Sequence, residues 1–284
     1  MKNSPVTTQN IRRKGSMNMQ VKDKVIAVTG AGGGIGSALV KVLLEKGAKV
    51  AALDINESSL KQLLEKQSLY KDRLSIHKIN ITDMDAVLKL PDQIAEVFGH
   101  VDGIINNAGI IQHFVPILEL PIDNVKRVMD INFYGTLYMI KSFLPHLLKR
   151  PEGHIVNISS MGGFLPVPGQ SVYGASKAAI KLLSEGLYSE LLNTSVHVTV
   201  VFPGGVATDI TKNSDVVMKE MNEKKTKNYT MMSPLEAAEM IIKGMEKNKY
   251  HVYAGKDSKF MNIFSRLMPK KSSRLIANQM KDLL

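Results

Sequence analysis

Two side chains at helical spacing are the first residues of this sequence that could carry out chemistry. Tyr173 and Lys177 open a long helical pattern, and residues four apart lie on one face of a helix. A free phenol has a pKa of about 10, and an adjacent cation favours its ionised form. Such a pair could take a proton from an alcohol or return one to a carbonyl. The spacing alone is weak, because many surface helices carry it.

A predicted strand upstream of this pair ends in two hydroxyl groups. The stretch from Gly153 to Ser160 is typical of a buried strand followed by a turn. In doubly wound sheets, ligands bind beyond the carboxyl ends of the strands. We therefore expect Ser160 to lie where a reacting oxygen is held and Ser159 to point away. Taken alone, a serine at a strand end is more often a simple turn residue.

A glycine-rich turn near the start of the chain could bind a phosphate. The apolar run Val25–Thr29 leads directly into the turn 30–36 and then into a helical pattern. Glycines let the backbone approach a pyrophosphate closely, and the N-terminus of the following helix supplies N–H groups. The alternative is a turn that merely joins a strand to a helix.

An acid at the end of the second predicted strand bears on the choice of nucleotide. Asp54 lies about 20 residues beyond the glycine turn, where a carboxylate can bind both hydroxyls of an adenosine ribose and repel a 2′-phosphate. No Arg or Lys lies in the turn or directly after Asp54, so the sequence favours NAD over NADP. An isolated acid here could instead cap the next helix.

Six motifs in this order resemble those of the short-chain dehydrogenase/reductase family over about residues 22–255. They are Thr29, Gly30, Gly34 and Gly36; Asn106-Asn107-Ala108-Gly109; Asn132; Ser160; Tyr173 with Lys177; and the segment from Pro203 to Thr208. The family often has an aspartate where this chain has Asn80, but an amide can still accept a hydrogen bond from adenine. Together with the glycine turn, the resemblance predicts these cofactor-binding residues: Gly30, Gly32, Gly33, Gly34, Ile35, Gly36, Asp54, Asn80, Ile81, Asn107, Ala108, Gly109, Tyr173, Lys177, Pro203, Gly204, Val206 and Thr208.

The resemblance also implies a role for each catalytic residue. Ser160 would bind the substrate oxygen, Tyr173 would be the acid/base, and Lys177 would bind the nicotinamide ribose and lower the tyrosine pKa. Asn132 would hold a water that connects Lys177 to bulk solvent. Val206 and Thr208 would orient the carboxamide of the cofactor. Without the family pattern, Asn132 would be interpreted as an amide that binds its own helix backbone.

Apolar runs that alternate with helical patterns supply the scaffold for these residues. The strand-like runs are 25–29, 50–53, 74–79, 101–105, 154–158, 196–202 and 251–253. Near-continuous apolar strands separated by helices indicate a parallel sheet covered on both faces. We expect one doubly wound, Rossmann-like α/β domain at 22–255, with a disordered leader at 1–21, a substrate lid at 209–233 and a helical tail at 256–284. Ser233 and Pro234 are expected to begin the helix after the lid.

Charge and composition exclude several classes of protein. The net charge of +11 comes mostly from the ends, because residues 1–22 and 256–284 each carry +5 and leave the body at +1. A nucleic-acid-binding module is therefore disfavoured. With no cysteine, disulfides, thiolate catalysis and cysteine-ligated metals are excluded; His113 and His154 have no partner at metal-ligand spacing, so no metal is expected. The absence of cysteine and of a long apolar stretch favours a cytoplasmic protein.

The pocket and the tail leave alternatives open. The lid region contains Met218, Met221, Met231 and Met232, which favours a hydrophobic secondary alcohol or ketone as substrate, although these methionines could simply pack on the body. Residues after the fourth and fifth strands could line the pocket: Gln112, His113, Phe114, Met161, Gly162, Phe164 and Leu165. The basic, amphipathic tail is expected to dock on the domain or on another subunit, and the alternative is weak contact with an anionic membrane surface.

The sequence thus predicts an NAD(P)-dependent oxidoreductase that acts on a small molecule. Family analogy adds a homodimer or homotetramer formed through the helices that contain Asn132 and Tyr173. The main alternative is a dinucleotide-binding sensor or scaffold with the same fold and no turnover, which the intact Ser160, Tyr173 and Lys177 disfavour. An epimerase or dehydratase, as found among the longer relatives of this family, would need a larger substrate domain after the sixth strand than this chain has room for.

Overall fold

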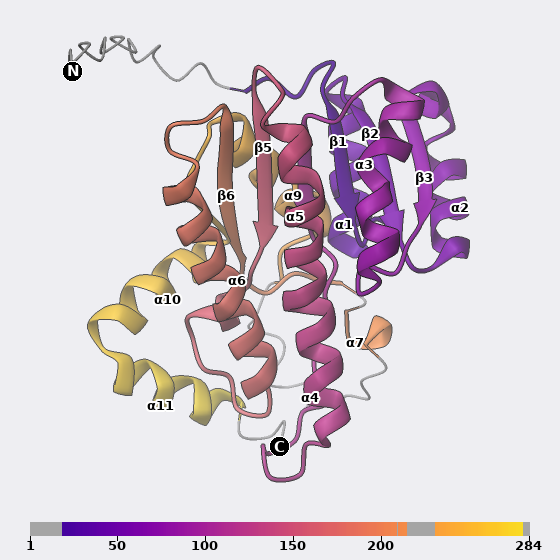
Figure 1. Cartoon of the computed structure of the whole chain (residues 1–284). Coiled ribbons are helices and arrows are strands. Elements are labelled where there is room, and N and C mark those ends of the chain that lie inside the picture. Colours follow the sequence, from indigo (N-terminus) through magenta and orange to yellow (C-terminus); the bar gives the residue numbers. More distant parts are fainter. Residues whose placement is uncertain (1–18, 209, 215–230, 281–284) are drawn as a thin grey trace, which may run out of the picture.

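The computed structural model describes residues 19–208, 210–214 and 231–280 (Figure 1). Most of the predicted leader, Met218, Met221 and most of the predicted lid therefore lie outside the described residues. Within them, the chain forms a doubly wound α/β fold, as the alternation of apolar runs predicts.

The described residues form a sheet of seven parallel strands in the order β3-β2-β1-β4-β5-β6-β7. The strands are β1 (Val25–Thr29), β2 (Lys49–Asp54), β3 (Leu74–Lys78), β4 (Gly103–Asn106), β5 (Gly153–Ile158), β6 (Val196–Pro203) and β7 (His251–Ala254). Every residue of β1, β4 and β5 is buried, because helices cover both faces of the sheet. The predicted strands are confirmed, with ends displaced by one or two residues.

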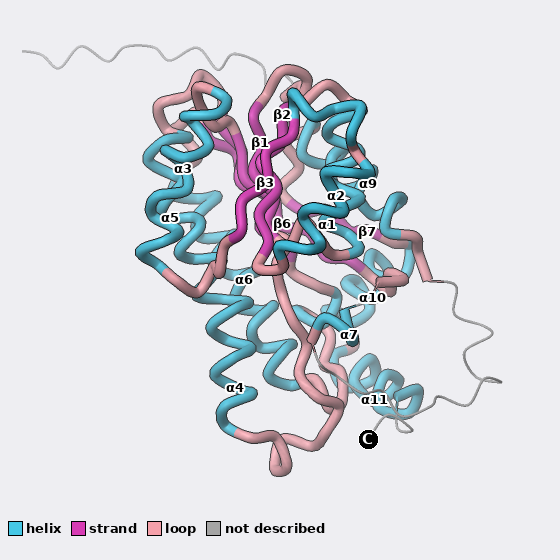
Figure 2. The backbone as a smooth tube through the Cα atoms, turned by 90° about the vertical axis from the view of Figure 1, so that its right-hand side faces the viewer, coloured by secondary structure: helices cyan, strands magenta, loops and turns pink. Residues whose placement is uncertain are grey.

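Two sets of helices sandwich the sheet, and Figure 2 shows them on opposite sides of it. On one face α1 (Gly34–Glu45), α2 (Glu57–Lys66) and α9 (Pro234–Glu246) share a core with Leu39, Leu60 and Ile241. On the other, α3 (Met84–Phe98), α5 (Thr136–Leu147) and α6 (Ser171–Glu190) bury Ile94, Phe143 and Leu187. The remaining helical segments are η1 (Ser68–Arg73), α4 (Ile122–Met129), η2 (Asp130–Gly135), η3 (Met161–Gly163) and α7 (Ile210–Asn213).

The tail forms two further helices, α10 (Lys256–Leu267) and α11 (Pro269–Met280). Leu165, from the loop after β5, packs against Met261 and Ile276 of these helices in a small separate core. Ahead of them, Ser233 caps α9 through a capping box with Glu236, and Pro234 occupies the first turn. The tail therefore docks on the body at the edge of the sheet where the strands end (Figure 1).

Candidate functional site

A cleft of about 670 Å³ lies at the carboxyl ends of the strands. Strand order reverses between β1 and β4, and such a reversal opens a crevice between the connections that leave the sheet on opposite faces. All the cofactor-binding residues predicted from the sequence line this cleft, from Asp54 and Asn80 at one end to Tyr173 and Lys177 at the other. Ser160 lines it as well.

The glycine turn is packed too closely for side chains. Gly30 has a φ of +64°, a conformation that favours glycine. A Cβ on Gly36 would lie 1.9 Å from the carbonyl oxygen of Gly30. The side-chain nitrogen of Asn107 donates to the carbonyl of Thr29 at 3.0 Å, which fixes the turn to the end of β4. Because no side chain caps the N-terminus of α1, its first N–H groups suit an anionic phosphate.

Asp54 stands at the end of β2 beside this turn. One carboxylate oxygen accepts a hydrogen bond from the backbone N–H of Gly32, and the other accepts one from Asn56, each at 2.9 Å. Each oxygen has a second lone pair for a ribose hydroxyl. Asn80 uses its side-chain oxygen to accept from the backbone N–H and hydroxyl of Thr82, so it borders the cleft from a tight local turn.

Tyr173 and Ser160 meet at the inner end of the cleft. Ser160 directly follows β5 and caps the short helix η3, where its hydroxyl accepts from the N–H of Gly162 at 3.0 Å. Burial raises the pKa of Tyr173, and a hydrogen bond with the Ser160 side chain acts in the opposite direction. Ser159 turns to α6, and its hydroxyl donates to the backbone carbonyl of Lys177 at 2.7 Å.

Lys177 is buried one helical turn beyond Tyr173. Its Nζ donates to the carbonyl of Ile158 at 3.0 Å and lies 6.0 Å from the centre of the Tyr173 ring. Burial lowers the pKa of Lys177 to about 8. Burial therefore disfavours the charged form of this lysine, and in the protein alone burial is also the largest influence on the pKa of the phenol.

Asn132 lies behind the cleft wall rather than in it. It sits in the π-helical turn η2, where its amide exchanges two hydrogen bonds with the backbone of Ile110 and donates a third to the Ser176 hydroxyl, each at 2.9 Å. A Cβ on Gly109 would lie 3.0 Å from Nζ of Lys177 and 3.1 Å from Oδ1 of Asn132. The amide thus binds a neighbouring loop and α6, which differs from a side chain that binds its own helix.

The cleft contains further residues that sequence reasoning missed. Ile110 and Ile111 follow the Asn-Asn-Ala-Gly motif directly, and their place in the chain could have pointed to them. Arg127 on α4 has no such signal. The lining residues that the sequence analysis did not assign to the cleft include Ile110, Ile111, Arg127, Ile131, Ile158 and Ile210.

Several residues expected to line the pocket lie elsewhere. Gln112 and Leu165 are 2% and 1% exposed; Gln112 packs under the start of α6, and Leu165 packs against the tail. Phe164 contacts Phe202 edge to face at 5.5 Å. The expectation that these three line the cleft is wrong, because Gln112 turns under the first turn of α6, and the loop after β5 turns towards Phe202 and the tail helices. The other residues of that expectation, His113, Phe114, Met161 and Gly162, do not border the cleft either. His154 is a core residue bound to Thr199, and burial lowers its pKa to about 3. Among the described residues, no cluster could hold a metal ion.

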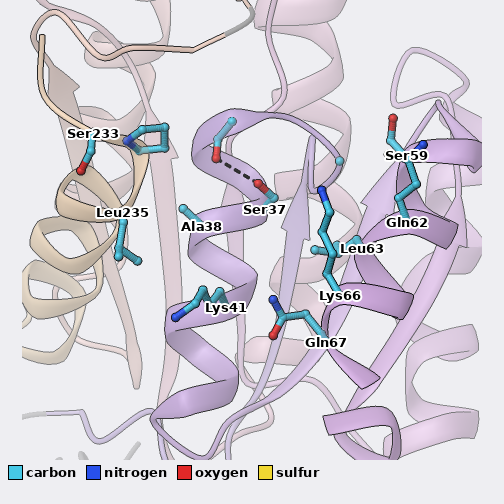
Figure 3. Close-up of a pocket in the computed structure, with 13 residues that line it drawn as sticks. Ser37, Ala38, Lys41, Ser59, Gln62, Leu63, Lys66, Gln67, Ser233 and Leu235 are labelled. Carbon is cyan, nitrogen blue, oxygen red and sulfur yellow. Dashed lines mark hydrogen bonds between the residues drawn. The ribbon is translucent and has the colours of Figure 1, made fainter. Parts of the chain in front are cut away.

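A second hollow of about 430 Å³ lies on the outer side of the glycine turn, between α1, α2 and the start of α9 (Figure 3). It shares Gly32, Gly34 and Ser59 with the cleft. Lys41, which reaches this hollow, is paired with Glu45. Neither Tyr173 nor Ser160 borders it, so the groups that could do chemistry belong to the cleft.

Comparison with known proteins agrees with this geometry. The sequence profile of the family described as short chain dehydrogenase matches residues 24–218. SadH of Mycobacterium tuberculosis, named as an oxidoreductase, is 34% identical over 260 residues, which cover 89% of this chain and 94% of SadH. An uncharacterized oxidoreductase of Staphylococcus epidermidis is 36% identical over 69% of this chain and 84% of its own.

Solved structures share the fold over most of its length. A short-chain dehydrogenase/reductase from Burkholderia phymatum in complex with NAD superposes with a TM-score of 0.80 at 21% identity, over 89% of this chain and 96% of that one. A short-chain dehydrogenase from Burkholderia cenocepacia in complex with NADP gives a TM-score of 0.76 at 26% identity, over 91% and 99% of the two chains. The chain therefore belongs to the short-chain dehydrogenase/reductase family and is an oxidoreductase that works with a nicotinamide cofactor.

Proposed function

We propose that this enzyme interconverts a hydrophobic secondary alcohol and the corresponding ketone, with NAD as the preferred cofactor. The observation that carries the proposal is the meeting of the Tyr173 phenol and the Ser160 hydroxyl at the inner end of a cleft whose other end is a glycine turn with an uncapped helix. Phosphate-binding features and a proton-transfer group thus share one cavity.

The residues of the cleft have separate tasks in this proposal. A nicotinamide cofactor held in the cleft would supply the hydride acceptor for the alcohol or the hydride donor for the ketone. Ser160 donates a hydrogen bond to the substrate oxygen, and the Tyr173 oxygen takes the hydroxyl proton in oxidation and returns it in reduction. Lys177 binds the ribose beside the ring. Asn132 holds α6 and the loop of Ile110 together, so that Lys177 and Tyr173 keep their places.

Asp54 supports the preference for NAD. Its carboxylate borders the cleft together with Ile55, Asn56 and Ser59, and none of these carries a positive charge that would offset a 2′-phosphate. Two like charges in this position would repel each other, whereas ribose hydroxyls would donate to the carboxylate.

Apolar residues of the cleft support a hydrophobic substrate. Ile110, Ile111 and Ile210 line the same cleft as Tyr173. The start of the proposed lid is attached there, because the hydroxyl of Ser214 accepts a hydrogen bond from the N–H of Ile111 at 3.0 Å.

A substrate screen with one variant tests the proposal. Alcohols and ketones are assayed with NAD(H) and NADP(H) by the absorbance of the reduced ring. Tyr173→Phe is expected to lower turnover at least 100-fold and to leave the dissociation constant of NADH within about two-fold of wild type. Tyr188→Phe, on the same helix but packed against Tyr250, is the matched control and should keep full activity. Unchanged turnover in Tyr173→Phe would show that the acid/base assignment is wrong.

We also propose a homo-oligomer built through the helices that contain Asn132 and Tyr173, which are η2 with its continuation α5, and α6. Leu182 on α6 and Leu148 at the end of α5 are 69% and 44% exposed, and a partner that covers α6 would remove such apolar side chains from water. Light scattering should report a dimer or tetramer, and Leu182→Glu should lower the measured mass. A monomeric wild-type protein would contradict this arrangement. The cytoplasmic location stays a prediction.

Contact of the tail with an anionic membrane surface is the last part of the proposal. No described helix is long and apolar enough to cross a membrane. While Met261 of α10 faces the body, Phe260, Ile263 and Leu267 form a stripe that is 64%, 51% and 75% exposed. Lys256, Lys259 and Arg266 lie on the same helix, and its one acid, Asp257, accepts from the N–H of Gly205. The positive charges on this face would repel the same face of a second copy and would attract anionic lipid.

Flotation with vesicles tests the tail. Wild-type protein should float with vesicles that contain phosphatidylserine and should remain unbound with phosphatidylcholine alone. The double substitution Phe260→Glu and Leu267→Glu should abolish flotation, and Leu69→Glu, a change at an exposed residue far from the tail, should not. If wild-type protein fails to bind the anionic vesicles, the tail has no such role.

A further inference from the structure

The first turn of the helix that carries Tyr173 is capped by a side chain from a distant loop. A helix leaves its first N–H groups without partners inside the helix. In α6 the residue at the N-cap, Gln170, makes no side-chain cap. Instead, the side-chain oxygen of Gln112 accepts from the N–H of Val172 at 2.8 Å and from that of Tyr173 at 3.0 Å.

Gln112 is fixed on its other sides as well. Its side-chain nitrogen donates to the carbonyl of Gly169 at 2.8 Å, and its own carbonyl accepts from the side chain of Gln170 at 2.8 Å. The side chain is 2% exposed, so water does not compete for these bonds. Gly169, with a φ of +74°, ends the loop that leads into α6, and Gln112 holds this loop and the helix in one orientation.

Gln112 also connects α6 to the part of the cleft proposed to hold the cofactor. It lies three residues beyond Gly109, which lines the cleft, and the intervening Ile110 is bound on both backbone atoms by Asn132. The N–H group that Gln112 binds belongs to Tyr173 itself, the residue whose phenol faces Ser160. A displacement of the first turn would therefore move the phenol relative to the cleft.

We propose that Gln112 is a positioning residue, which sets the Tyr173 hydroxyl against the cofactor loop by capping α6 from outside the helix. The inference rests on the proposed role of Tyr173. It does not make Gln112 catalytic, because its side chain is buried under the first turn of α6 and does not line the cleft. Small errors of placement near reacting atoms lower rates strongly. Loss of the Gln112 cap should therefore lower turnover and leave cofactor affinity nearly unchanged.

Two substitutions separate positioning from simple packing. Gln112→Met keeps the size of the side chain and removes its polar atoms, whereas Gln112→Glu keeps an acceptor for both N–H groups next to the positive end of the helix. We expect Gln112→Met to lower kcat 10- to 100-fold, with the KM for NAD changed less than three-fold, and to shift the pH profile of kcat/KM. Gln112→Glu should recover most of kcat. Ser142→Ala, which removes a buried hydroxyl of α5 that donates to the carbonyl of Val87 and does not contact Gln112 or α6, is the control and should retain kcat within about three-fold.

Hydrogen exchange gives a readout that needs no substrate. The amides of Val172 and Tyr173 should be protected in wild-type protein and in Gln112→Glu, and should exchange at least ten-fold faster in Gln112→Met. Unchanged exchange in Gln112→Met, or an unchanged kcat and pH profile, would overturn the inference. If Gln112→Met does not fold, failure of Gln112→Glu to protect these amides would overturn it equally. Failure of the proposed function appears separately, as undiminished turnover in Tyr173→Phe.

Discussion

The buried Lys177 should make the cofactor-free protein less stable than a variant without it. At pH 7 the lysine is charged in both the folded and the unfolded chain, but in the fold that charge is buried. A pKa lowered from the ordinary 10.5 to about 8 corresponds to a cost of about 3 kcal/mol. Lys177→Met removes this cost and also the hydrogen bond to Ile158, which contributes about 1 kcal/mol.

The expected result is a net gain of about 2 kcal/mol in the free energy of unfolding at pH 7, or a Tm higher by about 4–8 °C. The gain should depend on pH with a definite sign. Between about pH 8 and 10.5 only the unfolded wild-type chain binds the proton, so wild-type stability rises relative to the variant as pH rises. Near pH 10 the two proteins should unfold at nearly the same temperature.

Thermal unfolding of cofactor-free protein at pH 7 and pH 10 is the assay, because bound ligand would itself stabilise the fold. Lys89→Met removes an exposed lysine from α3 and should change stability by no more than about 0.5 kcal/mol at either pH. The reasoning is refuted if Lys177→Met melts at or below the wild-type temperature at pH 7, or if its advantage is the same at both pH values. A gain in stability with lost turnover would show that the lysine is kept for function.

Two further predictions concern an acid of the cleft and an acid of the core. Asp54→Asn should raise the affinity for NADPH relative to NADH about 10- to 100-fold, because a partly screened charge repulsion of about 2 kcal/mol disappears. Fluorescence titration measures the two affinities, and Asp72→Asn at an exposed site is the control. An unchanged ratio of the two affinities would contradict the proposed role of Asp54. Asp102 is buried and accepts from Arg150 at 2.8 Å and from the N–H of Val25 at 3.0 Å. Asp102→Asn should therefore lower stability by about 2–3 kcal/mol in urea unfolding, whereas a change below 0.5 kcal/mol would mean that the pair contributes little.

The sheet and its order of elements could be predicted because their signals are local. Each strand is a short apolar run, and burial on both faces of a parallel sheet removes the polar alternation that would blur it. The glycine turn could also be predicted, because Gly30 and Gly36 are required by a close backbone contact between residues only a few positions apart. Strand ends shifted by one or two residues, because pairing with neighbouring strands, such as the pairing of Asp54 with Lys78 in the register of β2 and β3, decides where each strand stops.

The inner half of the cleft was harder to predict, because its residues meet only through tertiary contacts. Arg127 reaches the cleft from α4 without any motif. Gln112 was expected to line the pocket from its place after β4, yet it turns under α6, where the unsatisfied N–H groups of Val172 and Tyr173 lie. A polar side chain near a helix start is drawn to such groups, but the helix in question begins some 60 residues later in the chain.

Helix α6 is tied to the sheet by buried polar bonds as well as by apolar packing, and this bears on how the site keeps its geometry. Asn157 of β5 donates to the Ser184 hydroxyl at 2.9 Å, Ser159 donates to the carbonyl of Lys177, and Lys177 donates back to Ile158. Apolar contacts alone allow a helix to slide by small amounts, whereas three directional bonds at two positions of the helix, Lys177 and Ser184, do not. Because Ser160 is the next residue of the same strand end, these bonds set the distance between the two hydroxyls on which proton transfer depends.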